Sequence, residues 1–314
     1  MSLTIRCAEF IRRKMDQTPP DLLINMDKTV IERNLTMVYD QIYDRNSNLE
    51  FAKSFQKKCP VPNLHYSQYL DQEILISNIR LIVGLRFRDT KVDDPFIDIL
   101  FYDSDIEVLM NHLKEIKTAI IQHYSPLAPR WVRFEIYTEK RNLISLKPYT
   151  FDLHLVGKEL KREEQTIDSK ELFVEKIESW SLEDQELYSM EYAIFNQKNP
   201  SLDFVRAEPF DSIQSALKNG FLYRIHSHND LVGYYFIVED FYDVLDCYCV
   251  FDKLIFDRYQ GIHFAARAQI LIEQDILKRS NRTHALMIGT ISPLNFASLK
   301  SAESTGRKIL SSKI

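Results

Sequence analysis

The sequence predicts an α/β protein in which helices flank a mixed central sheet. Three observations support this fold class. Runs rich in branched and aromatic side chains, typical of strands, alternate along the chain with segments of helical apolar spacing. The apolar fraction of 45% and the charged fraction of 27% are near those of soluble folded proteins. The 314 residues suffice for two ordinary domains with a substantial core.

The first half of the chain has the order strand, strand, helix, strand. The predicted strands are Ile79–Phe87, Phe96–Tyr102 and Trp131–Tyr137, and the predicted helix, before the last of these strands, is Ile106–Tyr124.

The second half repeats this order and extends it. A helix over Leu182–Gln197 is expected to lie on the sheet. The other predicted elements are a hairpin of Phe221–His226 and Leu231–Val238, a strand within Leu245–Phe256, a helix Ile262–Lys278, a strand Thr283–Thr290 and a helix Leu294–Thr305. A duplicated architecture is one hypothesis, and two unrelated α/β halves are the alternative.

The most polar stretch, Lys158–Lys170, predicts the domain boundary. We therefore expect an N-terminal α/β domain over residues 1–165 and a second domain over 166–314.

Composition excludes several classes of function. The formal charge of −5 provides no general basic field for nucleic acid or an anionic membrane. Every apolar stretch is cut by charge well before the roughly 20 residues of a bilayer span, and no signal peptide is visible. Cys247 and Cys249, two of four cysteines, lie too close together to suggest a secreted disulfide framework. We expect a cytoplasmic protein.

One segment of the second half is suited to an anion. Between a predicted strand and a predicted helix stand Arg258 and Gly261, and no acid occurs from Ile262 to Ala266. The first turn of a helix presents unpaired backbone N–H groups, and a glycine there lets a phosphate approach the main chain. The same pattern is also common in ordinary strand-to-helix turns.

A second segment, after strand Thr283–Thr290, reads Asn295-x-x-Ser298 and ends at Gly306. Together with Arg258-x-x-Gly261, it resembles the GNAT acyltransferase superfamily in order and spacing, over roughly Val205 to Ile309. The resemblance implies a GNAT-like mixed sheet and, if the first half is a degenerate copy, two tandem GNAT-like domains.

The resemblance implies acetyl-coenzyme A, or another acyl-coenzyme A, as co-substrate and no metal. The acyl group would pass to a primary amine, in a small molecule or a peptide, by direct attack in a ternary complex. The residues that would hold the cofactor are Leu254, Ile255, Phe256, Arg258, Tyr259, Gln260, Gly261, Ile262, His263, Asn295 and Ser298.

For proton transfer, the resemblance places a carboxylate near the start of the strand within Leu245–Phe256. Asp246 is the first candidate base, with Glu239 and Asp252 in reserve. Ser298 is a candidate acid, because Ala302 stands where many members of the family carry a tyrosine. A nearby tyrosine or solvent is the alternative.

Other departures from the family pattern are His263 in place of glycine or alanine and Arg307 in place of an aromatic residue. Little chain remains after Arg307, so the family's final strand is short or another segment covers that sheet edge. In the first half, acids at the start of its helix, within Tyr102–Glu107, would repel a pyrophosphate, so we expect no coenzyme A there.

Two other functions fit the same motifs. The donor could carry a larger acyl or an aminoacyl group, or the chain could be a catalytically inactive module that binds coenzyme A or another protein. His226 and His228 are attributed to a polar hairpin tip rather than to a metal site. The acceptor and the oligomeric state leave no signature in the sequence.

Overall fold

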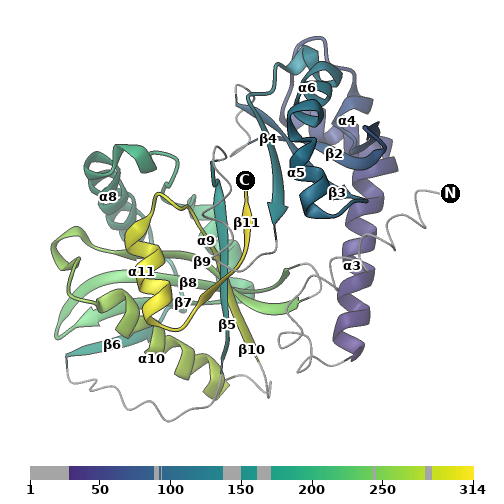
Figure 1. Cartoon of the computed structure of the whole chain (residues 1–314). Coiled ribbons are helices and arrows are strands. Elements are labelled where there is room, and N and C mark those ends of the chain that lie inside the picture. The colour runs from purple at the N-terminus through teal and green to yellow at the C-terminus, as the bar shows by residue number, and fades with distance from the viewer. Residues whose placement is uncertain are drawn as a thin grey trace. The chain divides into compact units, whose positions relative to one another are not determined.

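The computed structural model describes residues 28–87, 92, 94–136, 150–160, 171–242, 245–279 and 285–314. Backbone contacts divide the chain into two compact units (Figure 1). Of the described residues, the first unit contains Glu32–Thr150 and Ser311–Ile314, and the second contains 28–31 and Phe151–Leu310.

The first unit is built on a sheet with the strand order β1-β2-β3-β4, in which β4 runs parallel to β3 and the other neighbours are antiparallel. Its strands are β1 (Gln72–Ile76), β2 (Ile79–Phe87), β3 (Pro95–Tyr102) and β4 (Trp131–Ile136). Its helices are α3 (Lys28–Ser47), α4 (Leu49–Lys58), α5 (Ile106–Asn111) and α6 (Leu113–His123). Ile116 and Ile120, one turn apart on α6, are fully buried.

The free side of β4 pairs with the last residues of the chain. Strand β11 (Lys308–Lys313) runs antiparallel to β4 with Ser312 opposite Ile136. Phe134 and Ile314 exchange backbone hydrogen bonds of 3.1 and 3.0 Å. The C-terminus thus completes the sheet of the first unit.

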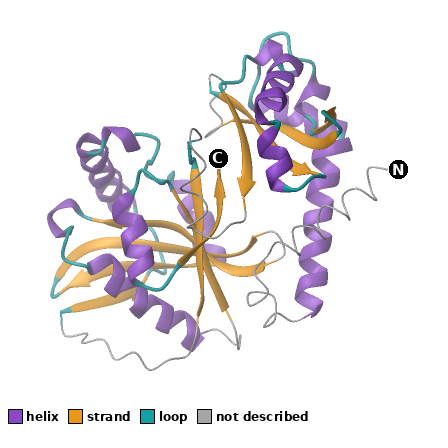
Figure 2. Cartoon of the chain, in the orientation of Figure 1, coloured by secondary structure: helices purple, strands orange, loops and turns teal. Residues whose placement is uncertain are grey.

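The second unit has the strand order β6-β7-β8-β9-β10-β5, with β10 parallel to β9 and the other neighbours antiparallel. Its strands are β5 (Leu153–Leu160), β6 (Leu172–Lys176), β7 (Gly220–Ser227), β8 (Asp230–Tyr242), β9 (Leu245–Ile255) and β10 (Ala285–Ile291). Its helices are α8 (Leu182–Lys198), α9 (Phe210–Asn219), α10 (Phe264–Arg279) and α11 (Phe296–Ser304). A mixed sheet flanked by helices confirms the predicted fold class (Figure 2).

Helices cover both faces of this sheet because alternate residues of a strand point to opposite sides. On β8, Tyr235 packs in a core with Ala268 and Ile272 of α10. Its neighbours Tyr234 and Phe236 pack in a second core with α8 and α9. The faces are called below the α10 face and the α8 face.

The elements predicted from the sequence are present, with ends that agree within two residues, except that β8 continues four residues beyond the predicted end at Val238. The predicted helix Ile106–Tyr124 is divided at His112 into α5 and α6. No strand had been predicted over β5. It belongs to the second unit and pairs with β10, with Gly157 opposite Ile288. Of the predicted boundary stretch, residues 161–170 lie outside the described residues.

The two units share a strand arrangement. In each, three antiparallel strands are followed by a helical segment and a strand parallel to the third. The next neighbour is antiparallel, and it comes from the other half of the sequence: β11 in the first unit and β5 in the second. Duplication remains a hypothesis.

Candidate functional site

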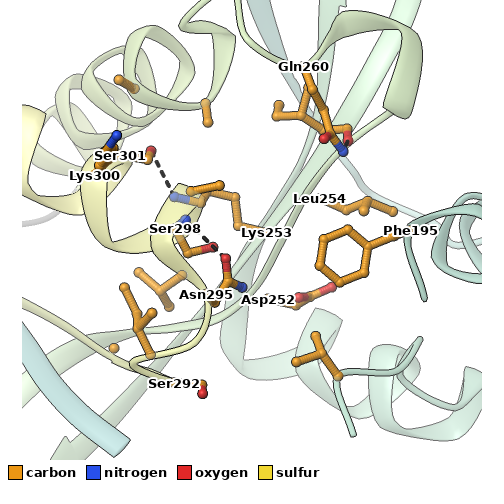
Figure 3. Close-up of a pocket in the computed structure, with 18 of the residues that line it drawn as sticks. Phe195, Asp252, Lys253, Leu254, Gln260, Ser292, Asn295, Ser298, Lys300 and Ser301 are labelled. Atoms are coloured by element: carbon orange, nitrogen blue, oxygen red, sulfur yellow. Dashed lines mark hydrogen bonds between the residues drawn. The ribbon is translucent and has the colours of Figure 1, made fainter. Parts of the chain in front are cut away.

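A cavity of about 680 Å³ opens in the second unit between β9 and β10 (Figure 3). Residues of α8 and α11, the loop that leads into α10 and the segment 204–208 before α9 also line it, together with Leu153, Ser292 and Arg307. All the lining residues belong to the second unit.

The cavity exists because the two parallel strands separate. Their pairing ends at Cys249 opposite Ile288. Beyond this point β9 continues to pair with β8 as far as Ile255, and β10 continues to pair with β5. Within these described strands, the facing edges of Phe251–Ile255 and Gly289–Ile291 have no partner strand, so their backbone amides are available to a ligand.

A β-bulge at Phe251 marks the point of separation. Val250 lies opposite Ile237 and Asp252 lies opposite Phe236, so Phe251 is an extra residue on β9. Such a bulge bends its strand and shifts the alternation of side chains. Val250 accordingly packs in the α10-face core, whereas Leu254 packs in the α8-face core.

Asp252 presents its carboxylate on the α8 face of the cavity. The hydroxyl of Tyr192 donates to Oδ1 at 2.6 Å, and the hydroxyl of Tyr188 donates to Oδ2. Burial raises the pKa of Asp252, and the two tyrosine hydroxyls and Lys253 act in the opposite direction. Helix α8 begins at a capping box formed by Ser181 and Asp184, which fixes the start of the helix that carries both tyrosines.

Lys253, the next residue, points to the opposite face. Its Nζ donates to Ser301 Oγ of α11 at 3.0 Å and lies 5.9 Å from the ring centre of Tyr235 (Figure 3). Burial lowers the pKa of Lys253 to about 7, with a further contribution from the positive charge of Arg307. The cavity wall therefore carries a carboxylate and an amine on the two faces of one strand.

The loop before α10 forms the outer end of the cavity. Gly261 has φ of +82°, and a Cβ added there would meet no atom within 4 Å. The side-chain amide of Gln260 donates to the Ile255 carbonyl at 3.2 Å, which ties the loop to the end of β9. Phe264, Ala265 and Ala266 also line the cavity. Their backbone N–H groups belong to the first turn of α10 and suit an anion.

Helix α11 contributes the opposite wall. Asn295 is its N-cap, and its side-chain oxygen accepts from the backbone N–H of Ser298 at 3.1 Å. Ala302 is fully buried in an apolar cluster with Val156 and Ile291, away from any proton transfer. Ser298 and Ser301 line the cavity.

The structure brings most of the predicted cofactor residues to this cavity. Those in its lining are Leu254, Ile255, Tyr259, Gln260, Gly261, His263, Asn295 and Ser298. The predicted cofactor residues outside the lining are Phe256, Arg258 and Ile262. The candidate bases Asp246 and Glu239 also lie outside it.

Three of the residues outside the lining are charged. Arg258 is exposed, and its guanidinium carbon lies 4.7 Å from the ring centre of Tyr259. Asp246 of β9 lies opposite Phe241, and Glu239 of β8 lies opposite Tyr248. Both pairs precede Cys249, the residue of β9 at which the pairing with β10 ends. Of the three acids weighed from the sequence, the one in the lining is Asp252.

Sequence reasoning did not identify Lys253 or Tyr192 as site residues. The signal for Lys253 was an acid and a base side by side within an otherwise apolar strand, Val250–Ile255. Tyr192 lies on the helix that the sequence predicts to pack on the sheet, and it is buried.

Among the described residues, no group of three or more His, Cys, Asp or Glu side chains could hold a metal ion. None of the helices in the described ranges combines the length and the apolar character needed to cross a bilayer.

No protein-family model and no curated protein matches this sequence. Among solved structures, the chain is similar to a GCN5-related N-acetyltransferase from Sphaerobacter thermophilus, with 12% identity, a TM-score of 0.46 and coverage of 87% of this chain and 93% of that one. A GNAT-family acetyltransferase from Colwellia psychrerythraea gives 11% identity, a TM-score of 0.45 and coverage of 84% and 93%. A GCN5-related N-acetyltransferase from Kribbella flavida gives 12% identity, a TM-score of 0.41 and coverage of 85% of this chain and 94% of that one. Values this low say nothing about the substrate of this chain.

Proposed function

We propose that the chain is an acyl-coenzyme A-dependent N-acyltransferase that transfers the acyl group, most simply acetyl, to a primary amine by direct attack. The observation that carries this proposal is the pair of proton-transfer groups, Asp252 and Lys253, on opposite faces of one strand that lines a cleft with an anion-suited loop at its end.

The residues present fit coenzyme A. The open loop at Gly261 and the first turn of α10 would hold the pyrophosphate. The separated edges of β9 and β10 would hydrogen-bond the amides of the pantetheine arm. From Val250 to Ile255 the strand rises roughly 17 Å, which is of the order of an extended pantetheine arm. When bound, acyl-coenzyme A supplies an activated thioester.

Asp252 would accept the proton that the amine loses. It lies on the α8 face, and the two tyrosine hydroxyls fix its orientation. Because its pKa is raised, the pKa of Asp252 is closer to that of an amine than the pKa of an exposed carboxyl group would be.

Lys253 would donate a proton to the leaving sulfur on the α11 side. An ammonium with a pKa of about 7 is acidic enough to protonate a thiolate, because a free thiol has an ordinary pKa of about 8.5. Lys253 thus supplies the proton donor that Ala302 cannot.

The test is release of free coenzyme A from acetyl-coenzyme A, and from longer acyl-coenzyme A, with a panel of primary amines. Asp252→Asn should lower the turnover rate about 10²- to 10⁴-fold. Asp246→Asn is the matched control and should retain activity, because Asp246 lies outside the lining. Binding of coenzyme A without turnover of any donor would support the inactive module instead.

A further inference from the structure

Arg307 is a buried arginine in the lining of the cavity, and two of its nitrogens have no partner. The residue is 2% exposed. Its Nη2 donates to Gln269 Oε1 of α10 at 2.7 Å, whereas Nε and Nη1 have no hydrogen-bond acceptor among the described residues. Burying a guanidinium with unpaired N–H groups costs free energy. A ligand group that accepts from them would recover that cost.

The neighbouring charges do not neutralise Arg307. Glu273 of α10 is engaged by Lys158, whose Nζ lies 2.6 Å from Glu273 Oε2. Glu273 Oε1 accepts from Gln269 at 2.7 Å. Lys253 adds a second positive charge to the same side, and its pKa is lowered in part by Arg307. This end of the cavity therefore favours an anion.

Arg307 marks the deep end of the cleft. A Cβ built on Gly289 would lie 3.4 Å from Arg307 Nη1 and 3.2 Å from Val250 Cβ. Gly289 follows Ile288, the last residue of β10 that pairs with β9. The loop around Gly261, which suits a phosphate, lies beyond Ile255, the last residue of β9. A thioester that enters from the loop would thus direct its acyl group toward Arg307.

Arg307 and Asp252 lie on opposite faces of the sheet, and this indicates which substrate reaches the guanidinium. Gln269, the partner of Arg307, belongs to α10 and also accepts from Tyr235 of the α10-face core at 3.1 Å. Asp252, the proposed proton acceptor for the amine, lies on the α8 face with Tyr192. Because the amine approaches from the α8 face, the group that meets Arg307 is part of the donor.

We propose that the preferred donor is the coenzyme A thioester of a dicarboxylic acid, whose free carboxylate accepts hydrogen bonds from Arg307 Nε and Nη1. This assignment rests on the proposed function and narrows its donor. It accounts for the arginine that stands where the resemblance led us to expect an aromatic residue.

The experiment is calorimetric titration of the full chain with coenzyme A, butyryl-coenzyme A and succinyl-coenzyme A. The last two have acyl groups of four carbons and differ in the free carboxylate. The native chain should bind succinyl-coenzyme A about tenfold or more tightly than butyryl-coenzyme A. Arg307→Met should remove this preference and leave the affinity for butyryl-coenzyme A within about threefold. Arg279→Met, which removes an exposed arginine from the end of α10, should retain the preference.

A second variant avoids removing the charge, since Arg307→Met could also disturb folding. Gly289→Ala should weaken succinyl-coenzyme A more than coenzyme A, because the added methyl group fills the space beside Nη1. Equal affinity of the native chain for the succinyl and butyryl esters would overturn the donor assignment and leave the acyltransferase proposal standing. No binding of any coenzyme A species would overturn both.

Discussion

Asp252 and Lys253 are consecutive on β9, yet their functional groups lie on opposite faces of the sheet. Tyr192 Oη lies 2.6 Å from Asp252 Oδ1 on the α8 face, and Ser301 Oγ lies 3.0 Å from Lys253 Nζ on the other. The bulge at Phe251 places this pair just beyond the point where β9 leaves β10. In the proposed function, one strand serves the amine on one side and the leaving thiolate on the other.

The pH dependence of turnover should separate these two roles. Ionisation of Asp252 should raise kcat/KM as pH increases, through a pKa above that of an ordinary aspartate. Loss of the proton from Lys253 should lower kcat/KM as pH rises through about 7. Lys253→Met should reduce the rate and abolish this falling limb. If kcat/KM of the variant still fell as pH rose through about 7, Lys253 would not be the proton donor.

Tyr192→Phe should move the rising limb to higher pH. The hydroxyl stabilises the Asp252 carboxylate, so its loss raises the pKa of that carboxyl further. Phe195→Leu is the matched control, since Phe195 also comes from α8 and lines the cavity without a hydrogen bond to Asp252. The measurement is the pH profile of kcat/KM for each of the two variants. Equal profiles would argue against Asp252 as the titrating base.

Lys253 should also make folding stability depend on pH. Its pKa is about 7 in the folded chain against an ordinary lysine value of 10.5, so between these values the unfolded chain binds more protons. The free energy of unfolding contributed by this group therefore rises as pH increases from about 7 to about 10.5, and is constant below that window. Denaturant unfolding of the native chain and of Lys253→Met at several pH values gives the difference in their free energies of unfolding, which measures this contribution. A flat difference across the window would contradict the lowered pKa.

Removal of the last four residues should destabilise the first unit. Ser311 and Ser312 are 1% exposed, and Ile314 exchanges two backbone hydrogen bonds with Phe134. A chain truncated after Leu310 should lose amide hydrogen-exchange protection in β4, while β7 of the second unit serves as the internal control. Equal protection of β4 in both chains would show that the C-terminal pairing contributes no stability.

Local sequence signals were sufficient for most of the site's framework. The strand within Leu245–Phe256, the following helix and the two motifs were predicted because each depends on residues adjacent in the chain. The glycine loop could be placed at a helix start for the same reason, and Gly261 does have positive φ.

The proposed proton acceptor could not be chosen in the same way. Asp252 follows Asp246 by six positions, an even number, so a regular strand would place both on one face. The bulge at Phe251 breaks that alternation, and it reflects pairing with β8 rather than a local signal. Pairing with a strand from the other half of the sequence is also a long-range property, so neither β5 beside β10 nor the pairing of the short final strand β11 with β4 was predicted.

We expect coenzyme A to bind in the cleft between β9 and β10 with its pyrophosphate at the loop around Gly261. The test is calorimetric titration of coenzyme A into the native chain, Gly261→Val and Arg258→Gln. Gly261→Val should weaken binding at least tenfold, because a branched side chain at φ of +82° strains the loop and covers its N–H groups. Arg258→Gln, at an exposed residue outside the lining, should change the affinity about fivefold or less. No binding by the native chain, or equal binding by Gly261→Val, would contradict the account.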